Sequence, residues 1–191
     1  AFLQRYPDIQ LEIIAESNVQ DVFRDGCDAG IRYDECLEQD VVAIPIGPRR
    51  QRFAAAASAE YLDRHGRPAH PRDLMQHACL RGRYASGIMT AWEFEREGEN
   101  LSVQVSGPLV VSVGGAVDLA VDTAKAGGGI LYLFEDWLQP AFASGELEPI
   151  LQPWWLSFSG PYLYYNDRRL IPAPLRAFID FVQEENLRCH R

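Results

Sequence analysis

The chain has 191 residues, of which 47% are hydrophobic and 24% are charged. This length allows one domain or two small lobes with a real core, and the composition is that of an ordinary globular protein. No stretch approaches the roughly 18 consecutive apolar residues that a membrane-spanning helix needs, and residues 1–10 lack a signal-peptide pattern. We therefore expect a cytoplasmic protein without membrane contact.

The charge of the chain argues against direct contact with DNA. Eighteen Lys and Arg residues against 27 Asp and Glu residues give a formal net charge of −9, whereas phosphate binding needs basic patches. The densest basic cluster is Arg49, Arg50 and Arg52, and a lesser one is Arg168 and Arg169. Both are expected to be solvated loops. If the protein acts on DNA, another segment must make the contact.

Strands and helices alternate in the first part of the chain. Residues 2–6 have the pattern of a last helical turn that Pro7 stops. A short helix is expected at 18–26, where Ser17 or Asn18 can cap the exposed amides. Strands are expected at residues 10–15, 28–33 and 41–46. The order strand, helix, strand indicates a right-handed βαβ unit and a parallel sheet.

A break at residues 47–52 separates this part from a second block. Its first helix is expected at 59–65, between a Ser58 cap and Gly66, and a shorter helix at 71–75. Strands are expected at residues 53–57, 79–83, 92–94, 101–105, 109–113 and 130–134, with a turn at 98–100.

Three helices are expected in the rest of the chain. The helix at 115–126 has Val117, Ala120, Val121 and Ala124 on its apolar face, and the next runs through Trp137 and Phe142. After a second break at 152–161 we expect a strand at 162–165 and an amphipathic helix at 174–184. Gly127, Gly128 and Gly129 follow a helix, so their amides should cap carbonyl groups and not hold a phosphate.

Cysteines and histidines give no pattern that is typical of a metal or catalytic site. The four cysteines, Cys27, Cys36, Cys79 and Cys189, form no C-x-x-C pair, and we expect reduced thiols. His77 and Cys79 alone are too few ligands for a closed zinc site. Nucleophile-elbow, P-loop and dinucleotide motifs are absent. We therefore predict no enzyme activity, no metal and no cofactor.

Polar residues at strand-to-helix junctions are the candidate ligand-binding residues. Hydroxyl groups and free amides at such junctions favour anions such as carboxylates, and an arginine at a strand end can bind a carboxylate. Capping for the serines and a surface ion pair for the arginine are the alternatives. The candidate residues are Ser17, Asn18, Arg32, Ser86, Gly87, Val113 and Gly114.

Aromatic residues near the second break leave a further alternative open. Trp154, Trp155, Tyr164 and Tyr165 could contact an aromatic effector or could pack in a core.

Several segments, in this order and spacing, resemble the effector-binding domain of LysR-type transcriptional regulators over nearly the whole chain. They are residues 2–12, 28–33, 61–62, 66–68, 71–74, 77–80, 126–130, 145–151 and 170–181. The resemblance implies an α/β fold of two Rossmann-like lobes joined by two crossover strands, like a type 2 periplasmic binding protein. Lobe I is expected at 1–50 plus 166–191 and lobe II at 51–165.

The resemblance also implies how such a domain works. A small effector binds between the lobes, and a separate N-terminal winged helix-turn-helix domain, which this sequence does not contain, holds DNA. Family members have a strand and most of a helix before the segment that begins at Phe2, so lobe I is expected to lack them. A homodimer is expected through residues 19–24 of one copy and 115–126 of another, with a tetramer for the full-length protein.

Two other classes of protein remain as alternatives. A transport-type solute-binding protein shares the fold but needs a signal peptide or a lipid anchor. A small α/β enzyme needs a nucleophile and a base that meet in the cleft, and the sequence offers no candidate pair.

Overall fold

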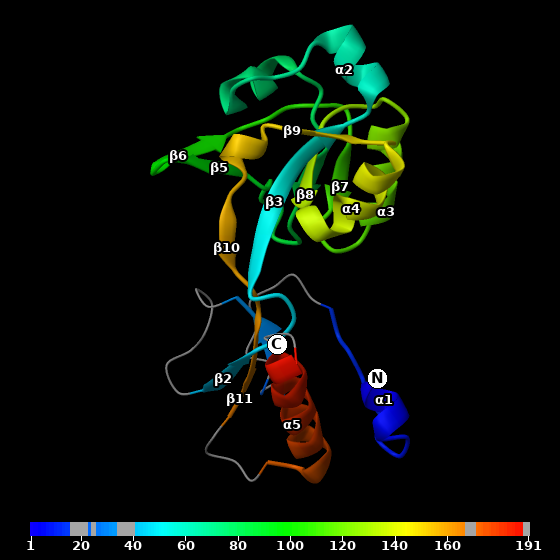
Figure 1. The fold of residues 1–191 in the computed structure, drawn as a ribbon, viewed down its shortest axis with the longest axis vertical. Coiled ribbons are helices and arrows are strands. Elements are labelled where there is room, and N and C mark those ends of the chain that lie inside the picture. Colours follow the sequence, from blue (N-terminus) through cyan, green and yellow to red (C-terminus); the bar gives the residue numbers. More distant parts are fainter. Residues whose placement is uncertain (16–22, 24–25, 34–40, 167–170, 189–191) are drawn as a thin grey trace. The chain divides into compact units, whose positions relative to one another are not determined.

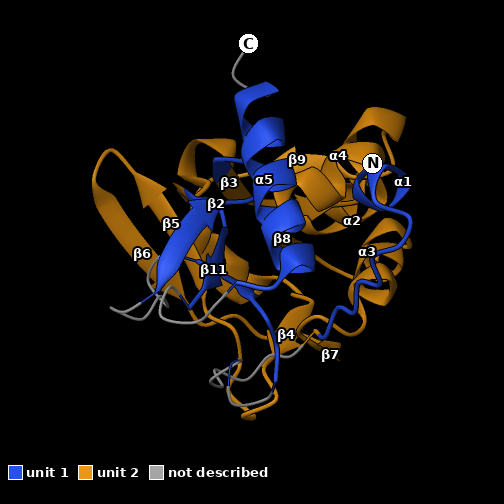
Figure 2. Ribbon diagram, turned by 90° about the horizontal axis from the view of Figure 1, so that it is seen from below, with its two compact units in different colours: residues 1–14, 19–50, 159–191 blue, residues 15–18, 51–158 orange. Residues whose placement is uncertain are grey.

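The computed structural model describes residues 1–15, 23, 26–33, 41–166 and 171–188. Its helices and strands form a mixed α/β fold (Figure 1). The chain divides into two compact units, coloured separately in Figure 2. Unit 1 comprises residues 1–14, 19–50 and 159–191, and unit 2 comprises residues 15–18 and 51–158.

The division between the units falls close to, but not at, the expected lobe boundaries. The chain passes from unit 1 into unit 2 between residues 50 and 51 and returns between 158 and 159, whereas we expected the return at 166. Residues 159–165 belong to unit 1 because strand β11 (Tyr162–Tyr165) pairs with two strands of that unit.

Unit 1 is built on a three-stranded sheet. Strand β11 lies between β1 (Gly30–Arg32) and β2 (Val42–Pro45), and both pairings are antiparallel. Helix α5 (Ala173–Arg188) contributes Ile179 and Val182 to a core that also holds Leu163 and Tyr165 of β11. The expected amphipathic helix is therefore confirmed, and it is longer at both ends.

The short helix α1 (Phe2–Arg5) is held against α5 by aromatic contacts. The ring of Phe2 lies 5.0 Å from that of Phe178 and 5.4 Å from that of Phe181, and Arg5 forms an ion pair with Glu184. The helix ends before Tyr6 and Pro7, as the proline predicts.

The structure differs from two of our expectations for unit 1, and a third concerns residues outside the described ranges. Residues 10–15 are exposed and form no strand, because no neighbouring strand pairs with their alternating pattern. The expected parallel sheet is wrong for the described strands, since β11 separates β1 from β2 and runs against both. The expected helix at 18–26 lies largely outside the described residues.

Unit 2 contains most of the secondary structure. Its strands are β3 (Arg50–Ala57, whose first residue lies in unit 1), β4 (Arg81–Arg83), β5 (Trp92–Arg96), β6 (Glu99–Val103), β7 (Val110–Ser112), β8 (Leu131–Phe134), β9 (Glu148–Ile150) and the start of β10 (Ser157–Ser159). Its helices are α2 (Ala59–His65), α3 (Val117–Lys125), α4 (Glu135–Ser144) and the 3-10 turns η2 (Pro71–Gln76) and η3 (Gln152–Trp154). Strands β9 and β10 were not predicted as strands.

Strand β3 is central to unit 2 because it contributes side chains to two hydrophobic cores. Its four alanines are fully buried and alternate between the two faces of the sheet, as the two-residue period of a strand requires. Ala55 and Ala57 face a core with Trp92 and Phe94 of the β5–β6 hairpin. Ala54 and Ala56 face a core with α3 and α4. In Figure 1 the hairpin and the two helices accordingly lie on opposite sides of β3.

The turns and caps of unit 2 follow from local chemistry. Ser58 caps α2 by accepting a hydrogen bond from the amide of Tyr61, and Gly66 ends the helix at a φ of 85°. Gly127 ends α3 at a φ of 78°, and the amides of Gly127 and Gly128 bond to carbonyls of the last turn, as predicted. The β5–β6 turn is tighter than expected, since β6 already begins at Glu99.

Within the described parts of the chain, no helix combines the length and the apolar character that crossing a bilayer requires.

Candidate functional site

The candidate site of unit 2 lies where strands β4 and β7 end. The two strands are parallel, with Arg81 opposite Val110 and Arg83 opposite Ser112. The carboxyl ends of parallel strands meet at one edge of a sheet, so the segments that follow Arg83 and Ser112 lie side by side. Such edges are the usual ligand positions of open α/β sheets.

Four of the predicted site residues lie at this edge. Ser86 and Gly87 form a turn after β4 in which the amide of Gly87 bonds to the carbonyl of Tyr84 at 2.9 Å, and Gly87 has a φ of 88°. Val113 and Gly114 follow β7, and Gly114 has a φ of 80°. All four residues are exposed. The structure therefore brings these four together, although they are far apart in the sequence.

Backbone donors at the edge are fewer than we expected. The amide of Val113 donates to the carbonyl of Arg83 at 3.0 Å, and the amide of Gly115 donates to the carbonyl of Ser112 at 3.1 Å. The amide of Gly87 is also bonded. These groups hold the two loops in place, so they cannot also bind a ligand.

The other predicted site residues belong elsewhere. Arg32 ends β1 in unit 1, and its guanidinium lies 5.6 Å from the centre of the Tyr164 ring. That ring occupies the space a side chain at position 30 would need, because a Cβ on Gly30 would lie 2.5 Å from it. Ser17 and Asn18 lie outside the described residues.

Apolar side chains surround the polar edge of unit 2. Tyr84, Ile88 and Val113 have 43%, 66% and 38% of their surface exposed. By contrast, Trp154, Trp155, Tyr164 and Tyr165 are all at least 92% buried, their exposed fractions being 6%, 7%, 3% and 8%. The core-packing alternative holds for these four aromatic residues.

Two arginines next to this edge did not figure among the predicted site residues. Arg81 and Arg83 are separated by one residue, so both side chains lie on the same face of β4. Arg83 is exposed at the end of the strand, and Arg81 lies one step deeper and is half-buried. One feature of the sequence could have pointed to these two arginines. The Arg-Gly-Arg pattern lies shortly before the turn at Ser86 and Gly87, and this order is typical of the end of a strand.

Two of the three arginines in the basic cluster, Arg50 and Arg52, lie in strand β3 and not in a loop. Strand β3 begins at Arg50, and Arg52 forms a two-pronged ion pair with Glu135 of α4, with both N–O distances 2.7 Å. The Arg52 guanidinium also lies 5.4 Å from the Trp155 ring. The hydrogen bonds to Glu135 raise the pKa of Arg52, because they stabilise its charged form. The charge of Arg52 is therefore balanced within unit 2.

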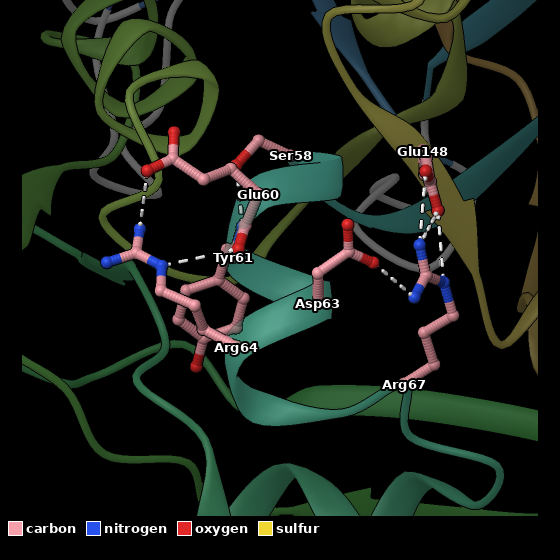
Figure 3. Close-up of polar contacts among 7 residues, drawn as sticks. All are labelled: Ser58, Glu60, Tyr61, Asp63, Arg64, Arg67 and Glu148. Carbon is pink, nitrogen blue, oxygen red and sulfur yellow. Dashed lines mark hydrogen bonds and ion pairs between the residues drawn. The ribbon is translucent and has the colours of Figure 1, made fainter.

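The charged residues of α2 are paired with one another or with Arg67, which follows the helix. Arg67 contacts Asp63 at 2.8 Å and Glu148 at 3.0 Å, and Arg64 contacts Glu60 at 3.2 Å (Figure 3). Figure 3 shows these side chains pointing toward one another, with Ser58 at the start of the same helix. Their charges are satisfied locally, so this surface is a poor candidate for an ionic ligand.

The described residues contain no cluster of metal ligands, and the thiol of Cys79 is buried. No group of three or more potential metal ligands occurs there. Cys79 is fully buried, and burial raises the pKa of its thiol to about 12, so the thiol stays protonated at neutral pH. His77 contacts the hydroxyl of Tyr61 and leads into a strand bridge at Cys79.

A hollow of unit 2 lies on the helices α3 and α4. It encloses about 380 Å³ and is lined by Val117, Asp118, Val121 and Trp137. Leu119 and Trp137 are 55% and 50% exposed. None of these residues was predicted as a ligand contact.

Two α/β units, joined by a chain that passes out and back, with exposed polar groups at a strand edge, define the class of two-lobe ligand-binding domains. The family model described as "LysR substrate binding domain" matches residues 1–187. The chain belongs to this family.

Relatives and solved structures agree with this assignment. The chain is 34% identical over 182 residues to the uncharacterized HTH-type transcriptional regulator YcaN of Escherichia coli K12, covering 95% of the chain and 58% of YcaN. It is 38% identical over 173 residues to a putative transcriptional regulator of Pseudomonas aeruginosa, covering 90% of the chain and 55% of that protein. The chain thus spans less than two thirds of these relatives.

Two solved structures match the fold. A full-length AphB variant has a TM-score of 0.80 at 25% identity, covering 95% of this chain and 60% of AphB. The CrgA regulatory domain of Neisseria meningitidis has a TM-score of 0.75 at 26% identity, covering 96% of this chain and 87% of that domain. The expected fold class, two Rossmann-like lobes of the periplasmic-binding-protein type, is confirmed.

Proposed function

We propose that this chain is the effector-sensing domain of a LysR-type transcriptional regulator and that it binds a small molecule at the ends of β4 and β7. The observation that carries the proposal is the exposed edge formed by Ser86, Gly87, Val113 and Gly114, in a chain of this family. Polar donors surrounded by apolar side chains are the usual lining of a small-molecule site. Arg32, Ser17 and Asn18 are retained as further ligand contacts.

The rest of the proposal concerns the full-length protein. The related proteins are HTH-type regulators, and we infer that a DNA-binding domain of the full-length protein holds the operator while this domain senses the effector. The acidic composition of this chain supports DNA contact through a separate domain, because its net charge of −9 opposes contact with phosphates. We place the full-length regulator in the cytoplasm, as a tetramer.

Self-association is proposed through helix α3. Leu119 is 55% exposed on α3, on the face of the helix opposite Val117 and Val121. An exposed large apolar side chain on a helix suits a protein interface. The helix expected at 19–24 is retained as the opposing surface of the second copy.

The proposed function is tested by a thermal-shift screen of the purified chain with small carboxylates, aromatic acids and amino acids. A ligand that binds only the folded state raises the melting temperature with its concentration. We expect at least one hit that calorimetry confirms and that the protein leaves chemically unchanged. Turnover of a hit would indicate an enzyme, and a Ser86→Ala, Val113→Asp double variant that keeps full affinity would move the site elsewhere.

A further inference from the structure

The hollow on helices α3 and α4 is a second place in unit 2 where a small molecule fits. Val121 of α3 and Leu138 of α4 pack on the same core. Beside that core the two helices leave about 380 Å³, lined by Val117, Asp118, Val121 and Trp137. Small-molecule sites span roughly 300–1,000 Å³, so the hollow has the size of such a site.

Trp137 provides an aromatic wall from α4. Its ring lies 5.0 Å from that of Phe134 at an angle of 80°, which fixes the orientation of the indole. Even so, 50% of Trp137 is exposed, whereas the other three tryptophans of the chain, Trp92, Trp154 and Trp155, are 1%, 6% and 7% exposed. The indole therefore offers its surface to a ligand.

The polar group of the lining is the carboxylate of Asp118. Within the described chain no basic residue lines the hollow. Lys125, at the far end of α3, pairs with Glu146 at 3.1 Å. Arg52 pairs with Glu135 at 2.7 Å, so the charges of both cations are balanced elsewhere.

The sign of the charge at this hollow follows from two opposing contributions. Asp118 lies in the first turn of α3, where the helix dipole favours an acidic residue. The dipole amounts to about half an elementary charge, and the carboxylate carries a full negative one. The rim of the hollow is therefore negative and complementary to a cation.

We propose that this hollow binds an organic amine in its ammonium form. The ammonium group lies between the Asp118 carboxylate and the Trp137 ring, since both attract a cation. The hydrocarbon part of the amine packs on Val117 and Val121, which lie one turn apart on the same side of α3. The site is separate from the proposed effector edge, and Leu119 lies on the other face of the helix, so self-association leaves it open.

The test uses phenethylamine, which is cationic at neutral pH as aliphatic amines are. Its neutral analogue 2-phenylethanol and its anionic analogue 3-phenylpropionate are compared with it on the whole chain. Because Trp137 is the one exposed tryptophan of the four, its fluorescence reports occupancy, and calorimetry gives the affinities. We expect saturable binding of phenethylamine, at least about tenfold tighter than that of either analogue.

Variants of two aspartates of the same helix locate the charge. Asp118→Asn should weaken phenethylamine binding about tenfold and remove the preference over 2-phenylethanol. The matched control is Asp122→Asn, which removes the same charge from an exposed position that does not line the hollow. It should change the affinity by less than about twofold. Trp137→Leu, followed by calorimetry, should also weaken binding.

A second measurement needs no ligand. Caesium and iodide ions quench an exposed indole, and a negative rim concentrates the cation and repels the anion. The ratio of caesium to iodide quenching of Trp137 should fall in Asp118→Asn and change less in Asp122→Asn.

Three results would overturn this proposal. They are the absence of saturable phenethylamine binding in the millimolar range, tighter binding of a neutral or anionic analogue, and equal behaviour of Asp118→Asn and Asp122→Asn. The Ser86→Ala, Val113→Asp variant separates this site from the effector edge. It should bind phenethylamine as the wild type does, and a loss of binding there would place the amine at the edge of β4 and β7 instead.

Discussion

Tyr61 and His77 form a half-buried polar contact that makes the stability of unit 2 depend on pH. The amide of Ala78 donates to the Tyr61 hydroxyl at 2.9 Å, which leaves the hydroxyl proton free to be donated to Nδ1 of His77, 3.3 Å away. Burial, and secondarily the nearby His65, lower the pKa of His77. The neutral imidazole is therefore the form that the fold prefers.

The expected pH dependence follows from the sign of this shift. Because the folded pKa lies below the unfolded value of about 6.5, the unfolded state binds more protons as the pH falls, and the free energy of unfolding decreases. We expect the melting temperature to fall between about pH 6.5 and pH 5. Thermal melts across this range measure it. His77→Gln should flatten the dependence, and a His77→Gln slope equal to that of the wild type would contradict this account.

Arg83 shows what residue-level reading of the sequence missed. The sequence placed Ser86 and Gly87 at a loop because both residues favour turns, and this is where they lie. It gave no reason to prefer Arg83 over the other arginines, because the position of Arg83 opposite Ser112 depends on a pairing between strands that are distant in the sequence.

At the scale of elements, α2 is the helix whose limits the sequence defined best. The expected and observed bounds agree at 59–65, because a serine cap at the start and a glycine at the end act within one turn. Strands were predicted less well. Residues 10–15 have a strand pattern but no partner, while β9 and β10 have partners but no clear pattern.

The cap of α2 gives a test at this scale. Ser58 is 5% exposed and its Oγ accepts the Tyr61 amide at 3.3 Å. We expect Ser58→Ala to lower the free energy of unfolding by about 0.5–2 kcal/mol, because the amide is left unpaired. Urea unfolding measures the loss.

The control for this variant is Ser102→Ala, on the exposed face of β6. It should change the free energy of unfolding by less than about 0.5 kcal/mol. Equal effects of the two substitutions would show that the cap contributes nothing.

At the scale of the whole molecule, self-association is the property that the proposed regulator needs. If α3 is the contact surface, a charge at Leu119 must be desolvated without a partner when two copies meet. We expect Leu119→Glu to raise the dissociation constant of the dimer at least about tenfold. Analytical ultracentrifugation over a concentration series measures it.

Met75→Glu is the matched control, since Met75 is 60% exposed on η2, outside the proposed surface. It should leave the association constant unchanged. A wild-type chain that stays monomeric at high concentration, or a Leu119→Glu variant that dimerises as the wild type does, would rule out this interface.

The sequence by itself determined the fold class, the family, the helices of unit 2 and most of its strands. These rest on local periodicity, on caps and turns, and on segments that occur in the same order throughout the family. Tertiary structure alone decided that β11 runs between β1 and β2, that β3 divides its alanines between two cores, and that Arg83 lies opposite Ser112 at the end of β4. Strand pairing and burial bring together residues that are far apart in the sequence. Local sequence patterns do not predict which of these distant residues are in contact.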